Sequence, residues 1–295
     1  MALDLKAVGR RIGPFTRCYD WKDVVLYALG VGAGFSEIDY CYEKSLKVIP
    51  TFAAAVLGDF TSQLAAASGF DPAGVLHGEQ EFIFHRPIPP AGTLTTEGAI
   101  VHCYDKGRDR GALVAAKFDT RQPDGQPLFT GVVTMFARLD GGFGGPDAPK
   151  KPLPFPDRPP DAAVSAAPPN DLPLIYRLSG DTFALHVDAE AARTAGFAQP
   201  VMHGLCTLGY ACRALIRRLT PGCPERVRRI GCRFVSPLYA GTPIQTLIWS
   251  SGEGRALWRV VRACDGGLVI DRGVFDFGDA VPNASARCPD PSGES

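Results

Sequence analysis

Apolar residues recur at helical spacing in two stretches about 150 residues apart. The second stretch carries them at alternating intervals of three and four: Leu205, Leu208, Cys212, Leu215 and Leu219. This spacing places all of them on one face of a helix. The first stretch, 51–69, is Ala-rich and ends at Gly69, a residue typical of helix C-caps. The pattern therefore predicts one long helix in each half of the chain.

Strand-like runs follow each predicted helix. They are rich in β-branched and aromatic residues and are interrupted by proline–glycine turns. The runs are 81–101, 111–120 and 130–139 in the first half, and 230–249, 255–264 and 268–278 in the second. Each half is therefore predicted to be an irregular entry, one long helix and about four antiparallel strands.

The two halves also resemble each other in detail. Tyr27 is followed by Pro50 after 23 positions, and Tyr176 is followed by Pro200 after 24. A period this long indicates two copies of one module. Small residues on the second helix, such as Gly204 and Gly209, allow a sheet to wrap closely around it. The predicted fold class is α+β, a double hot-dog in which each module wraps a curved antiparallel sheet around a long helix.

Residues 146–173 hold ten of the 26 prolines. Proline lacks a backbone donor and fixes φ, so such a segment is excluded from core helices and central strands. We expect an extended linker here, between an N-terminal module at 1–145 and a C-terminal module at 174–295.

Charge and composition exclude several classes of function. Lys+Arg and Asp+Glu both number 31, so no global field attracts nucleic acid or an anionic membrane. No apolar run has the length of a membrane span, and the N-terminus has no signal-peptide pattern. The nine cysteines form no Cys-x-x-Cys motif, so free thiols are expected and a metal site is not. These features predict a cytoplasmic protein without nucleic-acid or membrane partners.

Candidate chemistry is concentrated in the second half, at 179–186 ("SGDTFALH") and 199–209 ("QPVMHGLCTLG"). Asp181 and His186 are five positions apart, so only a turn would bring them together. His203 and Gly204 stand where the second helix begins, where free N–H groups can stabilise a developing oxyanion. Each residue also has a structural interpretation, as a turn cap, a half-buried polar group or a site of close packing.

The stretch from Tyr176 to Gly209 resembles the hydratase signature of the (R)-specific, type-two enoyl-CoA hydratases, the MaoC-like dehydratase family. The matching residues are Ser179, Asp181, Leu185, His186, Asp188, Gly196, Phe197, Pro200, His203 and Gly204. In the first half, "YALGVGA" and "LHGEQEFIFHRPIPPAG" are similar to the two-domain, eukaryotic-type members. The resemblance covers about 20–280.

The resemblance implies a reaction and a set of roles. Asp181 and His186 would hold and activate the water added to a trans-2-enoyl-CoA, giving an (R)-3-hydroxyacyl-CoA, or catalyse the reverse dehydration. The Gly204 N–H would bind the thioester oxygen. Ser179, Phe183, His203 and Leu205 are expected to contact the substrate. The acyl-CoA is the expected partner, and neither a cofactor nor a metal is expected. We also expect a homodimer.

The first half lacks the same chemistry. Aligned on the two tyrosines, Gly32 stands opposite Asp181 and Glu37 opposite His186. The family's N-terminal half accommodates a bulky acyl chain instead of reacting, and the same is expected here.

Two features leave alternatives open. Phe183–Ala184 stands where the family has Asn-Pro, so the chain could work without the asparagine, favour dehydration or another substrate geometry, or only bind acyl thioesters. A hot-dog acyl-CoA thioesterase is a further alternative. The basic residues Arg217, Arg218, Arg226, Arg228 and Arg229 either meet the CoA phosphates or form a solvated helix end.

Overall fold

The computed structural model describes residues 3, 5–149 and 153–279, and its strands join in one antiparallel ten-stranded sheet. The strands are β1 (Arg11–Tyr19), β2 (Val75–Phe84), β3 (Gly92–Asp105), β4 (Ala112–Arg121), β5 (Pro127–Ala137), β6 (Ala162–Ala166), β7 (Val227–Phe234), β8 (Ile244–Ser250), β9 (Arg255–Arg262) and β10 (Leu268–Phe277). The α-helices are α1 (Trp21–Gly30), α2 (Gly58–Ser68), α3 (Leu172–Tyr176), α4 (Ala189–Thr194) and α5 (Gly204–Leu219). Short 3₁₀ segments link them: η1 (Leu5–Ala7), η2 (Phe35–Tyr40), η3 (Glu43–Ser45), η4 (Pro50–Leu57), η5 (Pro72–Gly74), η6 (Arg177–Ser179), η7 (Ala184–His186) and η8 (Pro224–Arg226).

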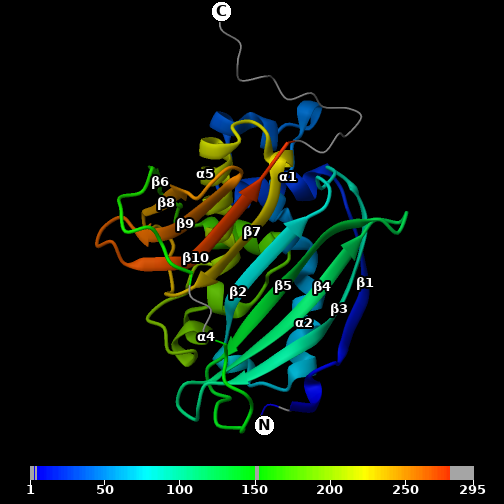
Figure 1. The fold of residues 1–295 in the computed structure, drawn as a ribbon, viewed down its shortest axis with the longest axis vertical. Coiled ribbons are helices and arrows are strands. Elements are labelled where there is room, and N and C mark those ends of the chain that lie inside the picture. Colours follow the sequence, from blue (N-terminus) through cyan, green and yellow to red (C-terminus); the bar gives the residue numbers. More distant parts are fainter. Residues whose placement is uncertain (1–2, 4, 150–152, 280–295) are drawn as a thin grey trace, which may run out of the picture.

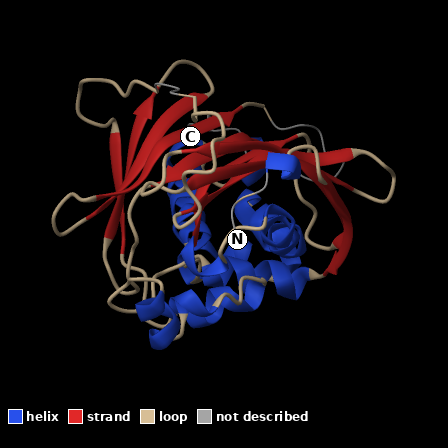
Figure 2. Ribbon diagram, turned by 90° about the horizontal axis from the view of Figure 1, so that it is seen from below, coloured by secondary structure: helices blue, strands red, loops and turns tan. Residues whose placement is uncertain are grey.

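The sheet repeats one strand order in its two halves. Read from each outer edge inward, the order is β1-β3-β4-β5-β2 in the first half and β6-β8-β9-β10-β7 in the second. The halves meet where β2 pairs with β7, with Glu79 opposite Arg233. Figure 1 shows the two halves fanning out from this seam, and Figure 2 shows the sheet arching over the helices. The predicted α+β arrangement of two repeated units is confirmed.

The long helices follow the sequence pattern with one difference. Helix α5 begins at Gly204 and ends at Leu219, as its periodicity predicts. In the first half, η4 precedes α2, and Gly69 follows α2 in the left-handed conformation of a C-cap (φ 71°). All eight residues of η4 are buried. Because η4 packs on every side, tertiary contacts rather than a single helical face determine its conformation.

Helix α1 was missed by the sequence analysis. It begins after Asp20, whose side chain accepts from the backbone of Lys22 and Asp23, while the Asp23 side chain accepts from the Asp20 N–H. This reciprocal capping box was visible in the sequence as two aspartates three positions apart.

The proline-rich segment does more than connect the modules. Within it, β6 pairs with β8 as the outermost strand of the second half. An edge position is compatible with the flanking prolines, because an edge strand leaves one side of its backbone unpaired. The expected extended linker therefore contributes a strand to the second half of the sheet.

Two further features concern the chain as a whole. Within the described residues, no helix is long and apolar enough to cross a membrane. Seven of the described cysteines are free thiols, as expected: Cys18, Cys41, Cys103, Cys206, Cys212, Cys232 and Cys264. Cys288 lies outside the described residues.

Candidate active site

A cavity of about 1350 Å³ lies between the two modules. The second module lines it with the loop at 179–186 and the first residues of α5. The first module lines it with α2 and the start of β2. The predicted site residues of the second module therefore face a cavity that the first module helps to enclose.

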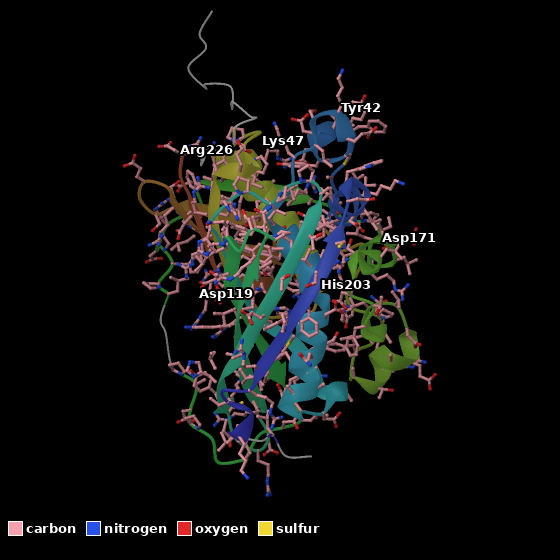
Figure 3. The ribbon with its side chains drawn as sticks, turned by 90° about the vertical axis from the view of Figure 1, so that its right-hand side faces the viewer. Tyr42, Lys47, Asp119, Asp171, His203 and Arg226 are labelled. Carbon is pink, nitrogen blue, oxygen red and sulfur yellow. The ribbon has the colours of Figure 1, made fainter. Side chains whose placement is uncertain are left out.

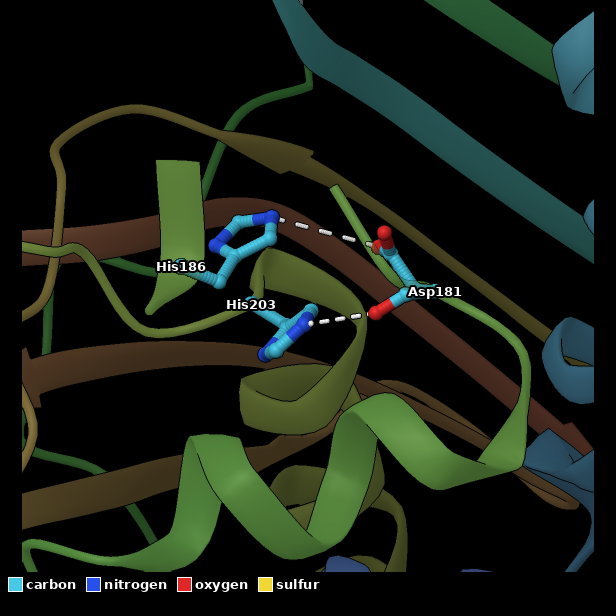
Figure 4. A group of neighbouring side chains, drawn as sticks. All are labelled: Asp181, His186 and His203. Atoms are coloured by element: carbon cyan, nitrogen blue, oxygen red, sulfur yellow. Dashed lines mark hydrogen bonds and ion pairs between the residues drawn. The ribbon is translucent and has the colours of Figure 1, made fainter. Parts of the chain in front are cut away.

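Asp181 and His186 converge on this cavity. A turn at Gly180, which has φ of 129°, separates η6 from the segment that carries both residues. The Asp181 carboxylate accepts from the Phe183 N–H at 3.2 Å, which fixes its orientation. The Asp181 Oδ2 and His186 Nε2 atoms are 3.9 Å apart (Figure 4). The structure thus brings together two residues that a helix would have separated.

The hydrogen bonds of His186 define its protonation state. Its Nδ1 lies 2.8 Å from the Val201 carbonyl, which can only accept, so Nδ1 carries the proton. Burial lowers the pKa of His186, against the opposing charge of Asp181. The neutral ring therefore directs the Nε2 lone pair toward Asp181. A separation of 3.9 Å is too long for a direct hydrogen bond, but it suits a water that donates one hydrogen to each residue.

His203 lies behind the ring of His186. It is only 1% exposed, and its ring stacks under that of His186 with centroids 3.7 Å apart. Its Nε2 donates to the Asp181 backbone carbonyl at 3.2 Å, and Tyr176 packs against its other side. In Figure 3 it is seen near the centre of the molecule, whereas Tyr42 and Asp171 lie at the rim. His203 does not line the cavity and supports both Asp181 and His186 from behind, so its expected contact with the substrate stays a prediction.

Gly204 forms the first turn of α5 at the cavity wall. The N–H groups of a first helical turn have no acceptor within the helix, and the positive end of the helix dipole lies behind them. A Cβ at position 204 would lie 3.1 Å from the ring of Phe234. Glycine therefore keeps the N–H close to whatever occupies the cavity. Leu205 follows it on the same wall.

Ser179 and Phe183 both line the cavity, in different environments. Ser179 is buried, and its Oγ has no hydrogen-bond partner among the described residues. Phe183 is 47% exposed, and its ring meets that of His186 edge to face at 6.2 Å. Phe183 thus covers one side of the dyad with an apolar surface at the solvent edge of the cavity.

His77 of the first module also lines the cavity. The register of β2 against β5 shifts between His77 and Glu79, which places a β-bulge at Gly78. One extra residue reverses the alternation of a strand, so His77 faces the same side as Gln80. Burial lowers the pKa of His77 to about 4. A glycine inside a strand pattern was the signal in the sequence.

Positive charge lines another part of the cavity, contributed by Lys106, Arg233 and Arg272. Burial and the nearby charges of Arg233 and Arg110 lower the pKa of Lys106. None of the basic residues that follow α5 lies there. Arg217 lines a separate cavity, and Arg229 pairs with Glu81 and Asp276. None of the five arginines named in the sequence lines this cavity, which agrees with their interpretation as a solvated helix end rather than a CoA phosphate site.

Asp181, His186 and His203 also offer potential metal-ligand atoms within 4.8 Å of one another. The His203 Nε2 already donates to the Asp181 backbone carbonyl, and the ring of His186 stacks on the ring of His203. Parallel rings direct their in-plane lone pairs side by side rather than toward one point. The arrangement therefore suits a hydrogen-bonded dyad better than a metal centre.

A two-module fold with a carboxylate–histidine dyad at a helix N-terminus defines the class of the protein, and comparison with known proteins identifies its family. The model of the MFE-2 hydratase 2 N-terminal domain matches residues 18–139, and that of the MaoC like domain matches 153–263. The chain belongs to the family of MaoC-like, type-two enoyl-CoA hydratases, which confirms the resemblance found in the sequence.

The relatives match along nearly the whole chain. The 3-hydroxyacyl-thioester dehydratase Y of Mycobacterium tuberculosis is 36% identical, over 94% of this chain and 99% of its own. A probable enoyl-CoA hydratase 2 of Dictyostelium discoideum is 36% identical, over 93% and 96%. The crystal structure of a MaoC-like dehydratase from Phytophthora capsici is 31% identical, with a TM-score of 0.83 over 94% and 99%. A Mycobacterium tuberculosis protein described as a double hotdog fold shares the fold alone, at 16% identity, with a TM-score of 0.58 over 92% and 96%.

Proposed function

We propose that this chain adds water reversibly to a trans-2-enoyl-CoA and forms an (R)-3-hydroxyacyl-CoA. The observation that carries the proposal is the 3.9 Å gap between Asp181 Oδ2 and the unprotonated Nε2 of His186, beside the start of α5. Relatives at 36% identity are named for enoyl-CoA hydration and 3-hydroxyacyl-thioester dehydration, which supports the same reaction here.

The reaction follows from these groups. A water that donates to Asp181 and His186 directs a lone pair at C3 of the enoyl group. As its oxygen bonds to C3, one proton passes to the dyad and the C2–C3 π electrons move onto the thioester, forming an enolate. The Gly204 N–H stabilises the enolate oxygen. The dyad then returns the proton to C2, and the second water proton stays on the new hydroxyl.

The cavity also accommodates the rest of the substrate. Its first-module wall is largely apolar, with Leu57, Ala65, Phe70 and Met135 among the lining residues, and suits an acyl chain. Lys106 and Arg272 provide positive charge of the kind that CoA phosphates require, whereas Arg233 is paired with Glu79. No step needs a metal, a redox cofactor or a covalent intermediate.

The first experiment is turnover of a panel of trans-2-enoyl-CoAs, with analysis of the products. A 3-hydroxyacyl-CoA product supports the proposal. Release of free CoA identifies the thioesterase alternative. Absence of turnover, with retained acyl-CoA binding, identifies a binding protein.

Phe183→Asn tests what the aromatic residue does at the edge of the dyad. Asparagine offers the water or the substrate oxygen a polar partner that phenylalanine lacks, and one added hydrogen bond corresponds to a change of about 2- to 10-fold. We expect kcat with a short unbranched enoyl-CoA to rise by this factor in steady-state assays. An unchanged kcat with an altered preference for chain length would assign Phe183 to substrate selection alone.

Chelation tests the proposed independence from metals. Prolonged dialysis against EDTA is expected to leave kcat and KM unchanged, because the proposed dyad reacts through a water held by hydrogen bonds. Activity that is lost on dialysis and restored by one divalent cation would instead assign an ion to Asp181, His186 and His203.

We also propose that the protein acts in the cytoplasm as a homodimer. The 54% exposed Leu174 and the 60% exposed Leu178 are large apolar side chains of a kind that a subunit contact would cover. Light scattering during gel filtration is expected to give twice the mass of the chain, 31.5 kDa. A mass of one chain would contradict the dimer.

A further inference from the structure

A second cavity, of about 520 Å³, lies further along α5 and shares no lining residue with the active-site cavity. The loop that follows α1 lines it with Gly32, Ala33 and Glu37. These positions stand opposite Asp181, Thr182 and His186 in the alignment of the two modules, and all three of those residues line the active-site cavity. The second cavity is therefore the first module's counterpart of the active site.

Each of the two cavities is also lined by one face of a long helix. Helix α2 lines the active-site cavity with Gly58, Thr61, Ser62 and Ala65, which are spaced by three, one and three positions. Helix α5 lines the second cavity with Tyr210, Arg213, Ala214 and Arg217, at the same spacing. Each helix thus lines its cavity with one face, which in α5 carries an aromatic residue and two arginines and in α2 carries small neutral side chains.

This substitution removes hydratase chemistry from the second cavity. Gly32 has φ of 81°, and a Cβ there would lie 2.2 Å from the Tyr210 hydroxyl oxygen, so an aspartate does not fit. Glu37 is held in an ion pair with Arg213, which is 12% exposed. Neither a free carboxylate nor a base remains to activate a water.

The cavity nevertheless has binding capacity for an anion. Arg213 donates to the Val31 carbonyl and pairs with Glu37, yet its buried Nε–H has no hydrogen-bond partner. No hydrogen bond or ion pair joins Arg217, one turn further along α5, to another described residue. Two arginines and one glutamate leave one net positive charge, and like charges at i and i+4 repel each other. The Arg213 Nε is itself inaccessible, so a monoanion would pair with the exposed Arg217 and reduce the repulsion between the two arginines.

The remaining walls define the rest of the ligand. Leu29, Ala33, Leu172 and Ile175 provide an apolar surface beside the guanidinium groups. A carboxylate matches the fork of a guanidinium, and an apolar body matches these walls. A CoA thioester carries several phosphates, for which a single net positive charge is insufficient. We propose that this cavity binds a free carboxylate with a short aliphatic chain, at a site separate from the hydratase centre.

Isothermal titration calorimetry of the full chain with hexanoate tests the proposal, with hexanamide as the uncharged analogue. We expect saturable binding of one hexanoate and no measurable binding of hexanamide. Arg217→Gln is expected to weaken hexanoate binding about tenfold or more, because it removes a charge-assisted hydrogen bond. Arg218→Gln removes the same charge from a neighbouring exposed position outside the cavity, and is expected to leave binding unchanged.

A second variant keeps the charge and fills the space. Ala167 is an exposed residue that lines the cavity, and Ala167→Phe is expected to abolish binding without disturbing the core. Hexanoate that binds Arg217→Gln and Ala167→Phe as well as the wild type would lie elsewhere, for example in the acyl part of the active-site cavity, and would overturn the proposal. Absence of saturable binding to the wild type would also overturn it. Neither result depends on whether the chain hydrates enoyl-CoA.

Discussion

Replacing Asp181 with asparagine is expected to lower kcat for enoyl-CoA hydration about a thousandfold and to change KM little. The carboxylate accepts a hydrogen from the proposed water, whereas one end of an asparagine amide donates. The amide also cannot take up or return a proton. Acid–base groups contribute about 10²- to 10⁴-fold to a rate, and Asp181 is placed where that contribution would arise.

Asp188 provides the matched control, because it is another aspartate of the same motif. Its side chain caps α4 by accepting from the N–H groups of Glu190 and Ala191. Asp188→Asn removes the same charge but acts only on the cap, so kcat is expected to remain near wild type. Circular dichroism would establish that both variants are folded. Equal losses of activity in the two variants would refute a special role for Asp181.

The geometry of the dyad could be predicted only in part from the sequence. Asp181 and His186 are five positions apart, so their meeting required a turn, and the glycine that makes the turn precedes Asp181 directly. The sequence also predicted that Gly204 begins α5, since the apolar periodicity starts there. Local patterns of this kind are visible because neighbouring residues determine them.

Contacts between distant segments were not visible in the same way. His203 was expected at the substrate, but the stack on His186 depends on how two loops pack across 17 residues of chain. His77 enters the cavity because of a register shift between β2 and β5, which long-range pairing decides. The ion pair of Glu37 with Arg213 joins the two modules. Such contacts depend on the assembled fold rather than on any short motif.

The pseudo-symmetry offers a reason for confining the proposed chemistry to the second module. Both modules place a loop and a helix face around a cavity, and the side chains at equivalent positions decide the outcome. Small residues on α2 leave space beside Asp181 and His186. Large and charged residues on α5 occupy the equivalent space beside Gly32 and Glu37. The duplicated fold therefore allows one cavity to specialise in catalysis.

Stability is expected to fall steeply as the pH decreases from about 6.5 to 4. Burial lowers the pKa of both His77 and His203 to about 4, and it also lowers that of His186. In an unfolded chain these residues titrate near 6.5, so the unfolded state binds more protons throughout this range. The contribution of the neutral rings to the free energy of unfolding is complete above pH 6.5, and it is lost as the pH falls toward 4. For His77 and His203, a pKa lowered by about 2.5 units corresponds to about 3 kcal/mol each.

Urea unfolding at a series of pH values measures this loss directly. His77→Leu puts an apolar side chain of similar size at this position and removes one of the three buried histidines. It is therefore expected to reduce the proton uptake on unfolding by about one in this range. Carboxylates with lowered pKa values, such as Asp188, lose their contribution only below their ordinary range near 3.8, and so remain separable from the histidines. A free energy of unfolding that stays constant between pH 6.5 and 4.5 would show that the buried rings accept protons without opening the site. In that case the neutral state of His186, on which the proposed water geometry depends, would hold only above pH 6.5.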